Sequence, residues 1–214
     1  MIQNQQCRRA SFKGETVKPD ELPTPKKWLD AVAADHAICG TYESSRHGDT
    51  CAAVIQHRHT TCICSYPMRT KHTSDTAYSL RRVVGPQAKP EHIYTYCSGE
   101  FAGATKECGW AAIHDTSTPY RPQTNGIAER AVRRVKEGTS CALMQAGIHV
   151  EWWAEAMQCV CFLWNTPPCD GRRSPCRTRF GCDVKGPRSP FGAAVIYKPT
   201  TPQEEPLLHT YHSK

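Results

Sequence analysis

Long apolar stretches are missing from this chain of 214 residues, and no run of apolar side chains approaches the roughly 20 residues that a membrane-spanning helix needs. The mean hydropathy of −0.58 agrees with this. The N-terminus is polar and lacks the apolar core of a secretory signal peptide. These absences argue against a membrane span and against secretion, and they predict an intracellular protein.

The cysteine spacing of a zinc site is also missing, although cysteine itself is abundant. Among the thirteen cysteines, no two are separated by the two residues that a zinc knuckle uses. The closest pairs are Cys62 with Cys64 and Cys159 with Cys161, and we expect the two thiols of each pair to point to opposite faces. An odd number of cysteines without a signal sequence argues against a disulfide scaffold. We therefore expect reduced thiols, most of them buried as small hydrophobic side chains, and no zinc.

Acidic residues are fewer than basic ones, with 20 Asp and Glu against 27 Lys and Arg, so the formal net charge is +7. This balance suits a polyanionic partner but does not prove one. A chain of this length can bury a substantial core, and one domain of about 150 residues with tails is the simplest expectation.

The most informative stretch runs from residue 117 to residue 130. Pro119 and Pro122 each fix φ near about −65° and predict an extended loop. Asn125, followed by glycine, is a turn signal, and we expect it to cap the next helix by accepting a backbone N–H with its side chain. That helix carries Glu129 in its first turn, followed by the cations Arg130, Arg133, Arg134 and Lys136.

Glu129 has two interpretations. It is either a surface glutamate stabilised by the helix dipole or a metal ligand held among phosphate-binding cations. The charge pattern alone favours the surface interpretation.

Residues 117–130 resemble the segment around the last acidic residue of retroviral and retrotransposon integrase cores, where a serine and a proline-rich loop lead into an Asn-Gly-x-Ala-Glu-Arg helix start. Later segments are similar to the region that follows the core in element-encoded integrases, namely 151–156, 165–167, 180–181 and 190–192. The resemblance covers roughly residues 28–198. It implies an integrase catalytic core from the Pol polyprotein of a retrotransposon.

The order of predicted elements agrees with this resemblance. Sequence patterns predict strands over 31–39, 51–55, 60–64, 92–96 and near 111–116, and helices from Ser74 to Gly85, near 102–108, over 126–146 and over 150–165. We expect the last helix to pack in the core. The resemblance implies an α/β fold with a ribonuclease H-like mixed sheet flanked by helices. We divide the chain into a linker or truncated segment (1–27), a catalytic core-like domain (28–148), a helical extension (149–198) and a polar tail (199–214).

In integrase cores, three carboxylates hold two Mg²⁺ ions that activate the attacking oxygen and stabilise the leaving one. By resemblance, Asp35 in the first strand and Glu129 correspond to the first and third acids. Asp35 also has a plainer interpretation as a buried structural aspartate. The second acid is expected four residues before the Glu100-Phe101 pair, and this position holds Tyr96. A tyrosine phenol is neutral at pH 7 and supplies no anionic ligand.

Three further positions bear on activity. We do not expect Glu100 to substitute for the missing acid, because it lies one helical turn away and productive geometry tolerates only about 0.5 Å. His57 and Cys62 stand where relatives usually carry an aspartate and an aromatic residue. These departures indicate a copy that is weak or inactive as a polynucleotidyl transferase.

The resemblance implies DNA as partner, both element ends and target duplex, Mg²⁺ or Mn²⁺ as cofactor, a possible homo-oligomer and, if the protein is functional, a nuclear location. The expected nucleic-acid-binding residues are Arg121, Gln123, Asn125, Arg130, Arg133 and Lys136, with Arg134 on the same helix. Those cations could equally form a solvated helix face. Two alternatives to an active enzyme stay open: a non-catalytic nucleic-acid-binding remnant and an unstable fragment without function.

Overall fold

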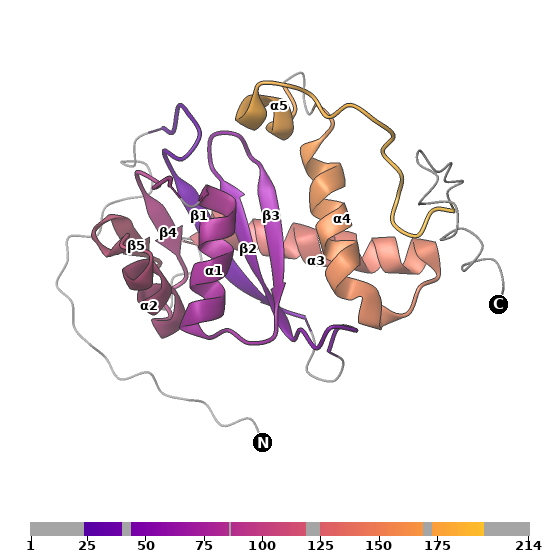
Figure 1. The fold of residues 1–214 in the computed structure, drawn as a ribbon, viewed down its shortest axis with the longest axis horizontal. Coiled ribbons are helices and arrows are strands. Elements are labelled where there is room, and N and C mark those ends of the chain that lie inside the picture. The colour runs from indigo at the N-terminus through magenta and orange to yellow at the C-terminus, as the bar shows by residue number, and fades with distance from the viewer. Residues whose placement is uncertain (1–23, 40–43, 86, 119–124, 169–172, 195–214) are drawn as a thin grey trace, which may run out of the picture.

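Five strands form one mixed sheet in the computed structural model, which describes residues 24–39, 44–85, 87–118, 125–168 and 173–194. The strand order is β3-β2-β1-β4-β5 (Figure 1). The strands are β1 (Val32–Ile38), β2 (Cys51–His57), β3 (Ile63–Met68), β4 (Ile93–Thr95) and β5 (His114–Thr116). β2 pairs antiparallel with β1 and β3, whereas β4 pairs parallel with β1 and β5. The predicted mixed α/β order is therefore confirmed.

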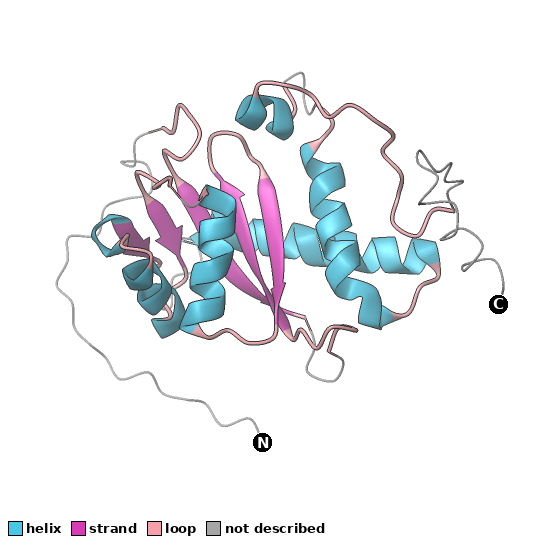
Figure 2. Cartoon of the chain, viewed as in Figure 1, coloured by secondary structure: helices cyan, strands magenta, loops and turns pink. Residues whose placement is uncertain are grey.

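Helices cover both faces of this sheet (Figure 2). α1 (Thr73–Val84) and α2 (Gly99–Glu107) pack with one face, and α3 (Gly126–Ala146) and α4 (Trp153–Asn165) pack with the other. β2 contributes Cys51, Ala53 and Ile55 to the first cluster and Ala52 and Val54 to the second. Because both faces of the central strands are buried, their sequences are apolar at nearly every position and do not alternate with polar residues. Among the helices of the described residues, none is long and apolar enough to cross a bilayer.

The expected strand 60–64 begins later than predicted, because a turn occupies its first residues. Thr61 has a positive φ of 56°, and the Cys62 N–H donates to Thr60 Oγ1 at 3.2 Å. β3 then continues through Pro67 to Met68. A proline is tolerated there because β3 is an edge strand of the sheet.

The starts of two helices also differ from the prediction. α1 begins at Thr73 with His72 at its N-cap rather than at Ser74, although its buried residues Ala77, Leu80, Val83 and Val84 are the predicted ones. α2 begins at Gly99, because the Ser98 hydroxyl accepts the Phe101 N–H and so caps the helix earlier than expected. The segment 111–116 is a 3₁₀ turn, η2 (Ala111–Ile113), followed by β5.

The two long helices after the sheet were both predictable from their period. α3 has the predicted bounds and buries Ala128, Ala131, Val135, Thr139 and Leu143. Gly138 lets α4 approach closely, since a Cβ there would lie 2.7 Å from Val160 Cγ1. The 3₁₀ turn η4 (Val150–Trp152) precedes α4. Trp153, Ala156 and Met157 are buried in the cluster behind the sheet, so the prediction that this helix packs in the core is confirmed, although Phe162 and Trp164 are exposed.

A short helix, α5 (Pro175–Phe180), was not predicted. Ser174 caps it by accepting the Arg177 N–H at 3.0 Å, Pro175 follows the cap, and Gly181 ends it with φ of 76°. These residues are the usual signals of a helix start and end. The division of the chain at residue 148 stays a prediction, although α4 shares a hydrophobic cluster with the sheet.

The expectation that Cys62 and Cys64 point to opposite faces is wrong. Side chains alternate along a strand with period two, so residues separated by one position share a face. Both sulfurs contact the same atom, Arg179 Nη1, at 3.9 and 3.8 Å.

Candidate active site

The candidate site begins with Asp35 in the middle of β1, at a partly buried position. One carboxylate oxygen, Oδ1, accepts the His36 N–H at 2.8 Å. The other, Oδ2, accepts an N–H from the Asn125 side chain at 3.0 Å. Both oxygens are therefore held, and one of them is held by a residue 90 positions further along the chain.

Asn125 does not cap α3 with its side chain, and this part of the prediction is wrong. It occupies the N-cap position, but its side chain makes no capping hydrogen bond. The side chain is buried and its amide N–H points to Asp35. A carboxylate is a stronger acceptor than a neutral group, so this contact explains the orientation. Among the described residues, Asn125 Oδ1 has no hydrogen-bond partner although it is buried, so an unsatisfied oxygen lies beside the acid.

Glu129 is exposed in the first turn of α3 and acts electrostatically on Asp35. Burial is the main cause that raises the pKa of Asp35, and the charge of Glu129 raises it further. The His36 N–H, the Asn125 amide and Lys71 act in the opposite direction. The structure thus brings the two acids into one electrostatic environment.

Tyr96 follows the end of β4, and its side chain is 52% exposed. Glu100, in the first turn of α2, is engaged elsewhere: its carboxylate lies 3.7 Å from Lys71 Nζ. A hydrogen bond from its own backbone N–H is the main cause that lowers the pKa of Glu100. Lys71 acts on both Asp35 and Glu100, and sequence reasoning missed it. The loop between β3 and α1 that carries Lys71 has no motif that marks it.

Ser117 anchors the start of the loop that precedes α3. Its N–H donates to Thr95 O at 2.9 Å, and its hydroxyl accepts the Cys97 N–H at 3.3 Å. The loop therefore leaves from the end of β4, next to Tyr96. Arg121 and Gln123 lie outside the described residues.

The predicted phosphate-binding cations of α3 lie in different surroundings. Arg130 and Arg133 are exposed, and neither forms an ion pair with any other described residue. Lys136 Nζ donates to Ile38 O at 3.0 Å. The Arg134 guanidinium lies 4.2 Å from the centroid of the Trp164 ring. Arg130 and Arg133 are therefore the cations of this face that stay available to a ligand.

The donor atoms at this site are oxygens, which suit a hard divalent cation. There are too few of them to hold two ions. The carboxylates of Asp35 and Glu129, together with Asn125 Oδ1, which has no partner within the described ranges, are oxygen donors of the kind that Mg²⁺ prefers. Among the described residues, no three His, Cys, Asp or Glu side chains gather into a metal site. These oxygens match a divalent cation in kind, but the described residues do not supply the ligand set of a two-metal centre.

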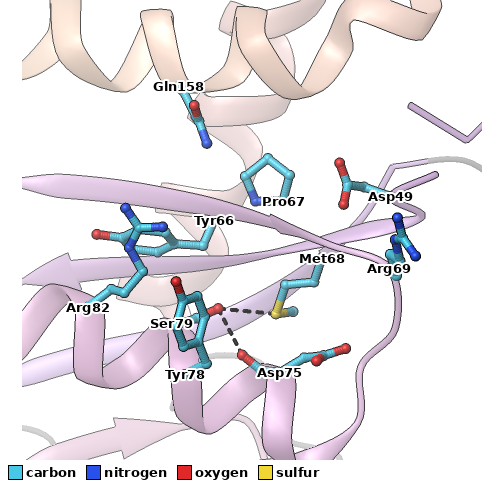
Figure 3. A pocket seen from close by; sticks show the side chains of 10 residues that line it. All are labelled: Asp49, Tyr66, Pro67, Met68, Arg69, Asp75, Tyr78, Ser79, Arg82 and Gln158. Carbon is cyan, nitrogen blue, oxygen red and sulfur yellow. Dashed lines mark hydrogen bonds between the residues drawn. The ribbon is translucent and has the colours of Figure 1, made fainter. Parts of the chain in front are cut away.

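A pocket of about 270 Å³ lies elsewhere, over β3 and α1 (Figure 3). Tyr66, Tyr78, Arg69 and Arg82 line it together with Gln158 of α4. Ser79, also in its wall, donates to Asp75 O at 3.0 Å and contacts Met68 Sδ. None of its lining residues belongs to the Asp35–Glu129 site, so the pocket is not part of it.

Comparisons with known proteins point to one kind of domain. No protein-family model matches the chain. A segment of 55 residues is 38% identical to the retrovirus-related Pol polyprotein from transposon TNT 1-94 of Nicotiana tabacum; it makes up 26% of this chain and 4% of that polyprotein.

Two solved structures resemble the fold. One is a chain of the simian T-cell lymphotropic virus intasome in complex with the PP2A regulatory subunit B56 gamma, with a TM-score of 0.57, 16% identity, and coverage of 84% of this chain and 63% of that one. The other is the HTLV-2 integrase catalytic core domain in complex with magnesium, in a trimeric form, with a TM-score of 0.54, 13% identity, and coverage of 72% and 97%. Likenesses at these identities establish the fold alone. The described part of the chain is thus an integrase-like domain, with the ribonuclease H-like fold of retroviral integrase catalytic cores and a segment similar in sequence to a retrotransposon Pol polyprotein.

Proposed function

We propose that this domain is the catalytic domain of a retrotransposon integrase, and that its DNA strand transfer is weak or absent because Tyr96 stands at the position of the second acid. The observation that carries this proposal is the hydrogen bond from Asn125 to Asp35, at the start of the helix whose Glu129 acts electrostatically on the same carboxylate. The fold and the sequence match to a Pol polyprotein support the same assignment.

The residues of the site have separate proposed roles in metal binding, in orienting Asp35 and in offsetting negative charge. Asp35 and Glu129 would hold Mg²⁺ or Mn²⁺, which when bound activates an attacking oxygen and stabilises a leaving one. Asn125 fixes the orientation of the Asp35 carboxylate, and Lys71 offsets part of the negative charge between Asp35 and Glu100. Tyr96 contributes no charge, so a second ion has too few anionic ligands.

The wider properties of an integrase belong to this proposal as well. The matched segment spans only 4% of the length of the Pol polyprotein. We therefore propose, for this chain, that it binds element DNA ends and a target duplex, assembles as an oligomer and acts in the nucleus. The described likenesses, an intasome and a trimeric catalytic core, favour a homo-oligomer on DNA.

A strand-transfer assay tests the proposed activity. We expect the unaltered chain, given an oligonucleotide duplex and a plasmid target with Mg²⁺ or Mn²⁺, to form product at or near the background level. Glu129→Gln serves as the control, since it removes one of the two remaining acids. Abundant product from the unaltered chain that Glu129→Gln abolishes would overturn the inactive assignment.

A second candidate function is nucleic-acid binding without catalysis, and it is favoured by Arg130 and Arg133, which are exposed and form no ion pair with any described residue. Lys and Arg side chains that neutralise phosphates release counterions, so such binding weakens steeply as salt rises.

Replacing both arginines by glutamine is expected to weaken duplex DNA binding at low salt. The slope of log K against log salt should fall by up to about 1.8, since each phosphate contact contributes about 0.9. Fluorescence anisotropy at several salt concentrations measures this, with Arg81→Gln/Arg82→Gln as a charge-matched control on α1. Binding that shows no salt dependence, or no binding at low salt, would remove this function.

A further inference from the structure

Two thiols and one guanidinium meet where α5 contacts the sheet. Cys62 immediately precedes β3 and Cys64 lies within it, so the two side chains share a face. Arg179 Nη1 lies 3.9 Å from Cys62 Sγ and 3.8 Å from Cys64 Sγ. Cys62 is 3% exposed, whereas Cys64 is partly open to solvent.

The guanidinium is fixed in this position by other contacts. Its Nη2 donates to Val83 O, at the C-terminal end of α1, at 2.9 Å. Its carbon lies 3.9 Å from the centroid of the Trp28 ring and 4.6 Å from that of Phe180. Within the part of the chain that the structure describes, no carboxylate forms an ion pair with Arg179. Its charge therefore faces the two sulfurs without a competing anion.

The two thiols consequently differ in acidity. Interaction with Cys62 is the main cause that lowers the pKa of Cys64, and Arg179 also lowers it, against the effect of burial. The same interaction, together with burial, raises the pKa of Cys62 above its ordinary value. Of the two, Cys64 is also the thiol that is partly open to solvent. The titratable and charged groups that face Cys64 are Cys62, Tyr66, Cys161, Cys176 and Arg179.

Other cysteines of the domain show the ordinary behaviour of buried thiols. Burial raises the pKa of Cys39 and of Cys161 to about 12. Cys159 and Cys161 have the same spacing as Cys62 and Cys64, but they lie on the helix α4, where positions two apart do not face each other. They form a matched pair without the shared face and without a cation.

We propose that Cys62 and Cys64 form an oxidation site, in which Cys64 reacts with a peroxide and Cys62 then closes a disulfide with it. Two thiols beside the same cation, one of them partly open to solvent, are suited to a peroxide-sensitive cysteine and its resolving partner.

The reaction proceeds in two balanced steps. The Cys64 thiolate attacks one oxygen of hydrogen peroxide, the O–O bond breaks, and a sulfenic acid forms with release of hydroxide. The Cys62 sulfur then attacks the Cys64 sulfur, and the displaced hydroxide leaves as water with the Cys62 proton. Two thiols are oxidised to one disulfide while peroxide is reduced to two waters, counting the proton that Cys64 had lost. The disulfide carries no charge, so oxidation removes the anion that faces Arg179.

Mass spectrometry of peroxide-treated protein tests this site directly. Trypsin releases residues 59–69 as one peptide, which contains Cys62 and Cys64 and no other cysteine. At low peroxide and pH 7 we expect this peptide to become two hydrogens lighter and to resist alkylation, while Cys159 and Cys161 stay alkylated. Cys62→Ser should leave a sulfenic acid at Cys64 that dimedone captures, and Cys64→Ser should abolish both products.

The contribution of Arg179 is read from a pH profile of the oxidation rate. Arg179→Gln should slow oxidation at pH 7 several-fold, because a higher pKa lowers the thiolate fraction of Cys64, and should recover the rate at higher pH. Arg179→Lys keeps the charge and should retain part of the reactivity. The proposal is overturned if the 59–69 peptide oxidises no faster than Cys159 and Cys161, if Cys64→Ser leaves the rate unchanged, or if Cys64 pairs with Cys176 instead.

Discussion

Replacing Asn125 by aspartate is expected to destabilise the domain by about 3 kcal/mol at pH 7, because it places a second carboxylate against Asp35 at a buried position. In the native chain, the Asn125 amide donates to Asp35 Oδ2 at 3.0 Å. The variant loses this hydrogen bond and gains a repulsion between two anions that share little solvent. Urea unfolding at pH 7 measures the loss.

The same variant should respond to pH and to Mg²⁺ in ways that the native chain does not. Lowering the pH lets one of the paired carboxyls take a proton and restores a hydrogen bond between them, so stability should recover. Millimolar Mg²⁺ should also restore stability, since Asn125→Asp gives the site a third acid beside Asp35 and Glu129. Asn125→Ala is the control: it should cost about 1–2 kcal/mol and gain no more stability from Mg²⁺ than the native chain does. Full stability of Asn125→Asp at pH 7 would contradict the contact with Asp35.

Acidification from pH 6.5 to pH 4 is expected to destabilise the domain through His57. This side chain is 1% exposed and stacks on Trp28 with ring centroids 4.2 Å apart. Its Nε2 accepts the Leu29 N–H, and its Nδ1 lies 3.2 Å from Thr60 Oγ1. Burial is the main cause that lowers the pKa of His57 to about 4, and the positive charges of His59 and Arg179 add to it.

Stability falls on acidification because the pKa of His57 is lower in the folded chain than in the unfolded chain. An unfolded chain binds a proton at His57 below pH 6.5, whereas the folded chain does not until the pH is near 4. Stability is therefore complete above pH 6.5 and falls as the pH drops toward 4, by about 3 kcal/mol for this one residue. His36, whose pKa burial also lowers to about 4, adds to the same slope. Unfolding free energies at pH 7, 5.5 and 4.5 measure it.

His57→Gln removes one of three histidines whose pKa is lowered by burial, the others being His36 and His114. The variant should therefore show a shallower loss of stability between pH 6.5 and 4 than the native chain, whatever its absolute stability. An identical slope in the native chain and the variant would show that His57 is not the neutral, buried acceptor described above.

Much of the fold could be predicted from sequence because its strands and long helices have clear patterns. β1 and β2 are short apolar runs, and the period of α3 gives its bounds. Prediction failed where local hydrogen bonds decide the outcome. The Thr60–Thr61 turn delays β3, and the Ser98 cap starts α2 early. α5 had recognisable signals in Ser174, Pro175 and Gly181, but it is too short to show a period.

The candidate site also contains residues that could be predicted from sequence and residues that could not. Asp35 and Glu129 follow from the resemblance, since both lie at motif positions. Their surroundings do not: Asn125 turns to Asp35 instead of capping α3, and Lys71 joins the site from a loop without a motif. Contacts between residues 90 positions apart are set by tertiary packing, which a single sequence does not encode in any local pattern.

Calorimetric titration with Mg²⁺, repeated with Mn²⁺, on the unaltered chain and on Tyr96→Asp tests the central claim most directly. Tyr96 is 52% exposed, so this substitution should change stability little. We expect weak binding of a single ion by the unaltered chain and binding at least about tenfold tighter by Tyr96→Asp, about 1.4 kcal/mol. Glu129→Gln in the Tyr96→Asp background should reverse the gain. Binding of two ions by the unaltered chain, as tight as that of Tyr96→Asp, would contradict the account.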